Sequence, residues 1–216
     1  MGPGRGRPFR DRTEAGRELA TLLRHYEGRT GVIVLGLPRG GVPVAAEVAA
    51  ALGAPLDVFV VRKLGVPGHD ELAMGAIADG GVRVLNPSVI AGLRISPDEI
   101  DRVADREARE LERRARAYRD DRPPPELAGK IAVVVDDGLA TGSTMRAAVS
   151  AVRARQPHRV VVAVPVGAAS TCAELAAEAD EVVCARTPPN FQAVGQWYVD
   201  FSPTTDDEIA HLLSTG

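Results

Sequence analysis

Residues 131–145, IAVVVDDGLATGSTM, join a run of β-branched residues to two aspartates and a loop of Gly, Ala, Thr and Ser. A continuous apolar run of this kind predicts a strand that is buried on both faces, as in a parallel sheet. Asp136 and Asp137 would then stand at the carboxyl end of the strand, where open parallel sheets bind ligands. Two adjacent carboxylates are costly there unless they hold something, such as a diol, a metal ion or a base.

The loop after the aspartates has the composition of a phosphate site. Ala140, Thr141, Gly142, Ser143 and Thr144 open the next predicted helix. Free backbone N–H groups, the positive end of the helix dipole and three hydroxyl groups therefore come together. A carboxylate pair beside a phosphate site fits a ribose 5-phosphate, with the diol on the acids and the phosphate on the loop.

Other interpretations account for less of this stretch. A P-loop requires a lysine after its second glycine, and no lysine follows Gly142. A phosphoaspartyl phosphatase would have its aspartates two residues apart on the first strand, whereas this pair is adjacent and in mid-chain. A response-regulator receiver has an acidic pair but lacks the hydroxyl-rich loop. A plain helix cap seldom needs Asp-Asp and Thr-Gly-Ser-Thr together.

Similar apolar runs predict the rest of a sheet. They lie at residues 32–36, 57–62, 160–166 and 181–184. Helical stretches separate them at residues 41–53, 141–156 and 168–179, and a helix over residues 12–26 precedes the first run. Strands that alternate with helices indicate an α/β fold with right-handed crossovers.

The alternation is interrupted between residues 65 and 127. Residues 65–85 predict loop and short strands, and residues 97–119 a long helix that a Ser96/Glu99 capping box begins. One apolar stripe on that helix is too little for a core of its own. We therefore expect one domain, with residues 1–64 and 128–216 as core and 65–127 as a lid and hood. Gly65–Gly81 should be its mobile part.

Composition narrows the function classes. The chain has 216 residues, 45% of them hydrophobic, and a net charge of −3, which gives no reason to expect nucleic acid or a membrane as partner. No signal-peptide h-region or spanning helix is evident, so we expect a cytoplasmic protein. Cys172 and Cys184 are predicted to be buried, inert thiols, and the four histidines are too scattered for a zinc site.

At VVVDDGLATGST, residues 133–144, the chain resembles the phosphoribosyl-pyrophosphate (PRPP) motif of the type I phosphoribosyltransferases. The resemblance implies a mostly parallel five-stranded core under a variable hood. It also implies transfer of ribose 5-phosphate from PRPP to a nitrogen nucleophile, with Mg²⁺ and release of pyrophosphate. On this basis Asp136 and Asp137 would hold the ribose hydroxyls, with indirect contact to the metal, and residues 140–144 would hold the 5-phosphate.

The loop after the first predicted strand, LGLPRGGVPVA, matches the family's pyrophosphate loop. Gly40 and Gly41 would let the backbone approach the anion, and Arg39 would add charge. A plain strand-to-helix turn would explain the glycines but not the arginine. Family members often carry a non-proline cis peptide here, and Pro38–Arg39 is the candidate.

Lys63, in VVRKLG, is predicted to end the second strand on the same side. It would neutralise pyrophosphate together with Arg39 or help a loop to close, unless it is simply a solvated lysine. His69, Asp70 and Glu71 follow in the segment where the family has its flexible catalytic loop, and their roles stay open. Closure of that loop would exclude water from a reactive ribosyl intermediate.

The likeness is greatest to small bacterial family members without an assigned substrate, and FRDRTEAGRELA, VVRKLGVPG and FQAVGQWYVDF extend it almost end to end. One departure concerns Ala140, where the hypoxanthine–guanine branch has an aspartate that serves as base toward the purine. A 6-oxopurine acceptor is therefore disfavoured. The adenine branch shares L-A-T-G, which is weak evidence for adenine.

The carboxyl-terminal stretch holds an unusual share of the few aromatic residues. Phe191, Trp197 and Tyr198 could stack on a planar acceptor, although such residues more often serve packing. The sequence thus predicts a PRPP-dependent transferase with a small-molecule acceptor and leaves a homo-oligomer open. The alternative is a non-catalytic PRPP or nucleotide sensor on the same fold.

Overall fold

The computed structural model describes residues 7–119 and 122–215, with the backbone alone at residues 69–71 and 215. Its centre is a five-stranded sheet of order β2-β1-β6-β7-β8, in which all neighbours are parallel. The strands are β1 (Val32–Gly36), β2 (Leu56–Val58), β6 (Ile131–Val135), β7 (Arg159–Val166) and β8 (Glu181–Arg186). The predicted α/β class and mostly parallel five-stranded core are confirmed.

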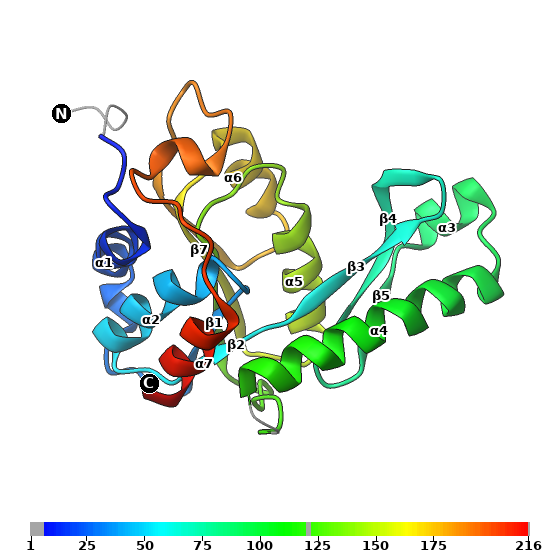
Figure 1. Cartoon of the computed structure of the whole chain (residues 1–216), viewed down its shortest axis with the longest axis horizontal. Coiled ribbons are helices and arrows are strands. Elements are labelled where there is room, and N and C mark those ends of the chain that lie inside the picture. Colours follow the sequence, from blue (N-terminus) through cyan, green and yellow to red (C-terminus); the bar gives the residue numbers. More distant parts are fainter. Residues whose placement is uncertain (1–6, 120–121, 216) are drawn as a thin grey trace.

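Helices cover both faces of this sheet (Figure 1). Side chains such as Ile33 and Val134 pack against α5 (Ser143–Arg153) and the end of α6 (Ala169–Leu175). Their strand neighbours, such as Val34 and Val133, pack instead with α1 (Arg12–Leu22) and α2 (Gly41–Leu52). Because alternate residues of a strand face opposite sides, a strand covered on both sides must be apolar throughout.

The order of the strands reverses at β1. The chain passes from β1 to β2 on one side, whereas β6 joins the other side of β1. The loops that follow β1 and β6 therefore leave the sheet side by side at the switch point, which is where open α/β sheets bind ligands.

An arm, defined here as residues 61–119, projects from the core (Figure 1). It holds an antiparallel sheet of β3 (Val61–Val66), β4 (His69–Ala78) and β5 (Val82–Leu85), followed by α3 (Pro87–Leu93) and α4 (Pro97–Arg119). Two expectations are corrected here. The predicted strand over residues 57–62 is divided between two sheets, so Lys63 lies within β3. Most of Gly65–Gly81 is paired strand, with the ten-residue β4, where loop and short strands were predicted.

The arm shares its hydrophobic cluster with the core. Leu64, Met74 and Leu111 of the arm pack with Val42 of α2 and with Ile209 of α7 (Asp206–Thr215). The long helix begins and ends where the sequence predicts. Its capping box forms as well, because Ser96 N donates to Glu99 Oε2 at 3.0 Å and Glu99 N donates to Ser96 Oγ at 3.3 Å.

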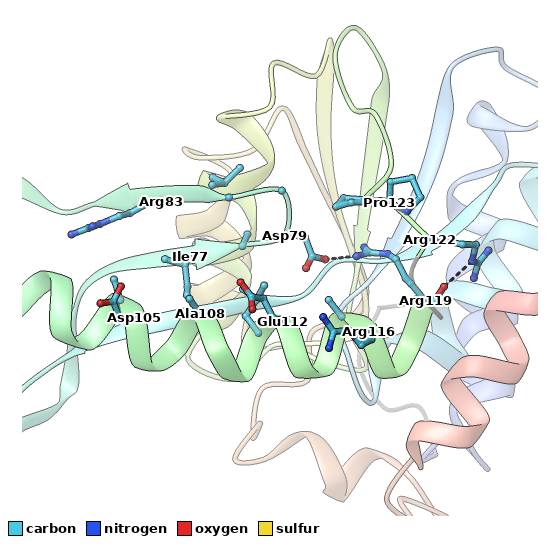
Figure 2. A pocket seen from close by; sticks show the side chains of 18 residues that line it. Ile77, Asp79, Arg83, Asp105, Ala108, Glu112, Arg116, Arg119, Arg122 and Pro123 are labelled. Carbon is cyan, nitrogen blue, oxygen red and sulfur yellow. Dashed lines mark hydrogen bonds and ion pairs between the residues drawn. The ribbon is translucent and has the colours of Figure 1, made fainter.

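A buried arginine holds the junction between core and arm. Arg119, 2% exposed, donates to Asp57 Oδ1 at 2.7 Å, to Asp79 Oδ2 at 2.8 Å and to the Val58 carbonyl. Asp79 also accepts from Val60 N at 3.1 Å. Figure 2 shows Asp79 and Arg119 facing each other beside a cavity of about 540 Å³ between α4 and the β4–β5 turn. We call these contacts the Arg119 clamp.

The clamp explains why one apolar run makes two strands. Val58 ends β2 and Val61 begins β3, and Phe59 and Val60 between them belong to neither strand. Arg119 donates to the Val58 carbonyl and Asp79 accepts from Val60 N, and both partners come from residues far along the chain. A buried connection between two sheets requires such partners because unpaired backbone groups are costly in the interior.

Candidate active site

The loops after β1 and β6 touch at the switch point. A Cβ atom at Gly40 would lie 2.0 Å from Asp137 Oδ2, and one at Gly41 would lie 2.6 Å from the Val135 carbonyl oxygen. Glycine is therefore required at both positions by the close approach of the acidic loop. The Pro38–Arg39 peptide bond is cis, as the resemblance implied.

The two adjacent aspartates have different environments. Asp136 Oδ1 accepts a hydrogen bond from Asp137 N at 2.9 Å. Burial raises the pKa of Asp136 well above its ordinary value, and the charge of Asp137 raises it further. Burial also raises the pKa of Asp137, but Arg12 opposes this effect. Desolvation therefore favours a proton on Asp136, and a paired cation favours the charge on Asp137.

Arg12 is the site residue that the sequence did not reveal. Its Nε and Nη2 lie 2.9 and 2.8 Å from Asp137 Oδ2, and the two side chains are only 12% and 15% exposed. Arg12 stands at the start of α1, 125 residues away from Asp137. It occurs in FRDRTEAGRELA, a stretch that matches related proteins, but no spacing in the sequence connects it to the acidic loop.

The predicted phosphate loop opens α5 with its N–H groups free of side-chain caps. Gly142 has a φ of +74°, and a Cβ there would lie 2.6 Å from Thr171 Cγ2. Thr171 Oγ1 donates to the Ala140 carbonyl oxygen at 2.8 Å, which fixes the loop from behind. Thr141 and Ser143 place their hydroxyl oxygens 3.3 Å apart. This is an anion-binding helix start with hydroxyl groups beside it.

Lys63 and Arg39 make their contacts on different elements. Lys63 Nζ lies 3.2 Å from Ser143 Oγ, so the arm reaches the phosphate loop directly. A second cavity of about 530 Å³ lies there between the arm and α5. Arg39 is half exposed, and its Nε lies 3.5 Å from Asp206 Oδ1 at the start of α7. A role for both residues at pyrophosphate stays a prediction.

The carboxyl-terminal aromatic residues pack beside the acidic pair. Tyr198 is 6% exposed and donates its hydroxyl to the Asp137 carbonyl oxygen at 2.6 Å. Phe191 and Trp197 are half-buried against a cluster that contains Tyr198 and Phe9. These contacts are those of packing residues, and stacking on an acceptor stays a prediction for all three.

Several other predicted features can be located. Among the described side chains, which exclude those of residues 69–71 and 215, no three His, Cys, Asp or Glu gather as a metal site, and no described helix could cross a membrane. The side chains of His69, Asp70 and Glu71 lie outside the described residues. Cys172 and Cys184 are free thiols. They are half-buried, whereas the sequence predicted that they would be buried. A hydrogen bond with Cys184 lowers the pKa of Cys172.

Comparison with known proteins identifies the family. The family model of the phosphoribosyl transferase domain matches residues 11–202. The chain belongs to the phosphoribosyl transferase family. Two curated proteins of Mycobacterium tuberculosis, from strains CDC 1551 and H37Rv, are each 53% identical over 205 residues, or 95% of this chain, and are provisionally named phosphoribosyl transferases. The match covers 46% of each, so this phosphoribosyl transferase chain spans less than half their length.

A solved structure supports the same relationship. The crystal structure of TT1426 from Thermus thermophilus is similar with a TM-score of 0.87 and 46% sequence identity. The alignment covers 95% of this chain and 97% of that chain. The likeness at this level includes the arm as well as the core of this phosphoribosyl transferase, because the core alone is too short for such coverage.

Proposed function

We propose that this phosphoribosyl transferase takes ribose 5-phosphate from PRPP and transfers it to a nitrogenous small-molecule acceptor, with release of pyrophosphate. The observation that carries the proposal is the contact between the two loops at the switch point. An acidic pair lies directly against a glycine-rich loop, and an uncapped helix start follows it. This arrangement can hold a diol between two anion-binding loops, which is the charge pattern of PRPP.

Each part would bind one portion of the substrate. The 5-phosphate would take the N–H groups and hydroxyls of residues 140–144. The position of Lys63 at Ser143 would bring its charge to this phosphate, in place of the role at pyrophosphate that the sequence predicted. The ribose hydroxyls would donate to the carboxylates of Asp136 and Asp137. Pyrophosphate would lie on Arg39, Gly40 and Gly41, where Arg39 stabilises the charge that develops on the leaving group.

The donors present would suit a Mg²⁺ ion that is bound together with the substrate. The ion keeps several waters in proteins and takes one or two carboxylates together with substrate phosphates. Asp136 and Asp137 provide that number of carboxylates, and the described residues add no third ligand to form a protein-only site. When bound with PRPP, the ion would neutralise charge on the departing pyrophosphate.

The proposal is tested by pyrophosphate release from PRPP and Mg²⁺ across a panel of nitrogenous bases. We expect release with at least one base and none from the variant Asp136→Asn/Asp137→Asn. Asp101→Asn is the matched control, because Asp101 is 62% exposed on the arm. A wild-type protein that binds PRPP in calorimetry but releases no pyrophosphate with any base would favour the sensor. Absence of PRPP binding would overturn both.

A further inference from the structure

We propose that Arg12 is a positioning residue that holds the Asp137 carboxylate for the ribose of PRPP and connects the chain's two terminal segments to that carboxylate. The inference rests on the proposed function and assigns a part in it to a residue outside the two ligand loops. The terminal segments meant here are Phe9–Arg12 and Trp197–Ser202, which we call the terminal cover.

The geometry divides the two oxygens of Asp137 between protein and ligand. Two nitrogens of Arg12 converge on Oδ2, at 2.9 and 2.8 Å. Gly40 packs against the same oxygen from another side, since a Cβ atom at Gly40 would lie 2.0 Å from Asp137 Oδ2 and 3.2 Å from Arg12 Nε. Oδ2 is therefore enclosed by protein, and Oδ1 is the oxygen that Arg12 leaves for a ribose hydroxyl.

The guanidinium of Arg12 is itself held in place by the terminal cover. Its Nη1 donates to the Ser202 carbonyl oxygen at 2.8 Å, and its Cζ lies 4.2 Å from the centroid of the Phe201 ring. The two segments of the cover are also paired with each other. Phe9 N donates to the Trp197 carbonyl oxygen, and Val199 N to that of Phe9, both at 2.8 Å. A planar fork held on three sides orients its partner more strictly than a free cation would.

Two neighbouring groups contact the backbone of Asp137 and not its carboxylate. Asp136 Oδ1 accepts a hydrogen bond from Asp137 N at 2.9 Å. The Tyr198 hydroxyl, from the terminal cover, donates to the Asp137 backbone carbonyl. Arg12 is thus the cation that pairs with the Asp137 carboxylate.

The experiment compares Arg12→Met, Arg12→Lys and Arg17→Met by calorimetry with PRPP and Mg²⁺ at pH 7.5. Arg17 is the matched control, because it lies on the same helix, is 65% exposed and pairs with Glu47. We expect Arg12→Met to bind PRPP at least about 10-fold more weakly than the wild type. Arg12→Lys keeps the charge but not the planar fork, so it should restore only part of the affinity, and Arg17→Met should match the wild type.

A second measurement separates the positioning of Asp137 from a general loss of the site. Inorganic phosphate should bind Arg12→Met as tightly as the wild type in calorimetry, because Arg12 holds the Asp137 carboxylate and not the phosphate loop. Equal PRPP affinity of Arg12→Met and the wild type would overturn the inference, and so would an equal loss of phosphate and PRPP affinity. A wild type that fails to bind PRPP would instead overturn the proposed function. Should Arg12→Met not fold, Arg12→Lys decides, and it must bind PRPP more weakly while its phosphate affinity is unchanged.

Discussion

The core sheet and the arm are held together by different kinds of contact. Strands β1, β6 and β7 are buried on both faces by two separate apolar clusters. In the arm, β5 alternates between half-buried and exposed positions, and Leu72, Leu85 and Leu93 are exposed. Two apolar clusters that the arm shares with the core, together with the Arg119 clamp, join the arm to the core. Apolar burial on both faces fixes the sheet that presents the ligand loops, whereas buried polar contacts add to apolar packing where the arm meets the core.

The largest effect should come from the clamp. Arg119→Met leaves Asp57 and Asp79 without their buried cation, which costs about 3–5 kcal/mol when one partner of a buried pair is removed. Denaturant unfolding measures the loss, with Arg113→Met as control, because Arg113 is 61% exposed and its pair contributes little. Adding Asp79→Asn to Arg119→Met should recover part of the loss. A cost below about 1 kcal/mol would show that the clamp does not hold the arm.

Removing apolar side chains from the core sheet should lower the free energy of unfolding by a smaller but measurable amount. Val134→Ala removes two methyl groups from a fully buried position in β6 and should destabilise the protein by about 2–3 kcal/mol. Val84→Ala in β5, where the side chain is half-buried, should cost less than about 1 kcal/mol. Equal costs in thermal or denaturant unfolding would remove the distinction between core and arm.

The core has a polar exception at Asp136. Burial raises the pKa of Asp136 in the folded protein above its value in the unfolded chain. The free energy of unfolding is therefore unaffected by Asp136 below the unfolded-state pKa and decreases as the pH rises through the folded-state pKa. Asp136→Asn removes this penalty and keeps an oxygen to accept from Asp137 N. Its Tm should exceed that of the wild type at pH 7.5 by about 2 °C or more, and the difference should vanish near pH 4. A Tm below that of the wild type at neutral pH would contradict this.

The contact between arm and phosphate loop should affect binding without affecting stability. Lys63→Met removes an exposed cation at Ser143, and we expect PRPP affinity to fall by about 5- to 10-fold with an unchanged Tm. Lys130→Met is the control, since Lys130 is the chain's other lysine and precedes β6 at the opposite end of the strand. Equal affinity of the two variants would remove Lys63 from the site.

The smallest effect concerns amide exchange in the arm. The β3–β4 register shifts around Gly65, whereas residues 75–78 are paired on both edges of β4. PRPP with Mg²⁺ should therefore slow exchange in residues 65–72 and change it little in residues 75–78 or in α4. Uniform protection of the whole arm, or none at its tip, would contradict closure by the tip.

The sequence was informative where burial is uniform. All five core strands were predicted, most clearly β1, β6 and β7, because a strand covered on both faces must be apolar at every position. The break between Val58 and Val61 was not, because it depends on Arg119 and Asp79, which are distant in the chain. The acidic residues and the phosphate loop lie within one continuous stretch, residues 136–144, so their proximity could be predicted from the sequence. Arg12 could not, since only the folded terminal cover brings it to Asp137.

If the arm tilts, the Arg119 clamp places the pivot at residues 58–60, where the chain passes from β2 to β3. With a rise of about 3.3 Å per residue, Lys63 lies roughly 10 Å from the pivot and Val66 roughly 20 Å. A tilt of about 10° would then move Lys63 by less than about 2 Å and Val66 by about 3.5 Å. A cation near the pivot would keep its place during such a tilt, while the far end of β3 would move further. Spectroscopic labels that are meant to detect this tilt therefore belong at the exposed Pro67, next to Val66, and not at Lys63.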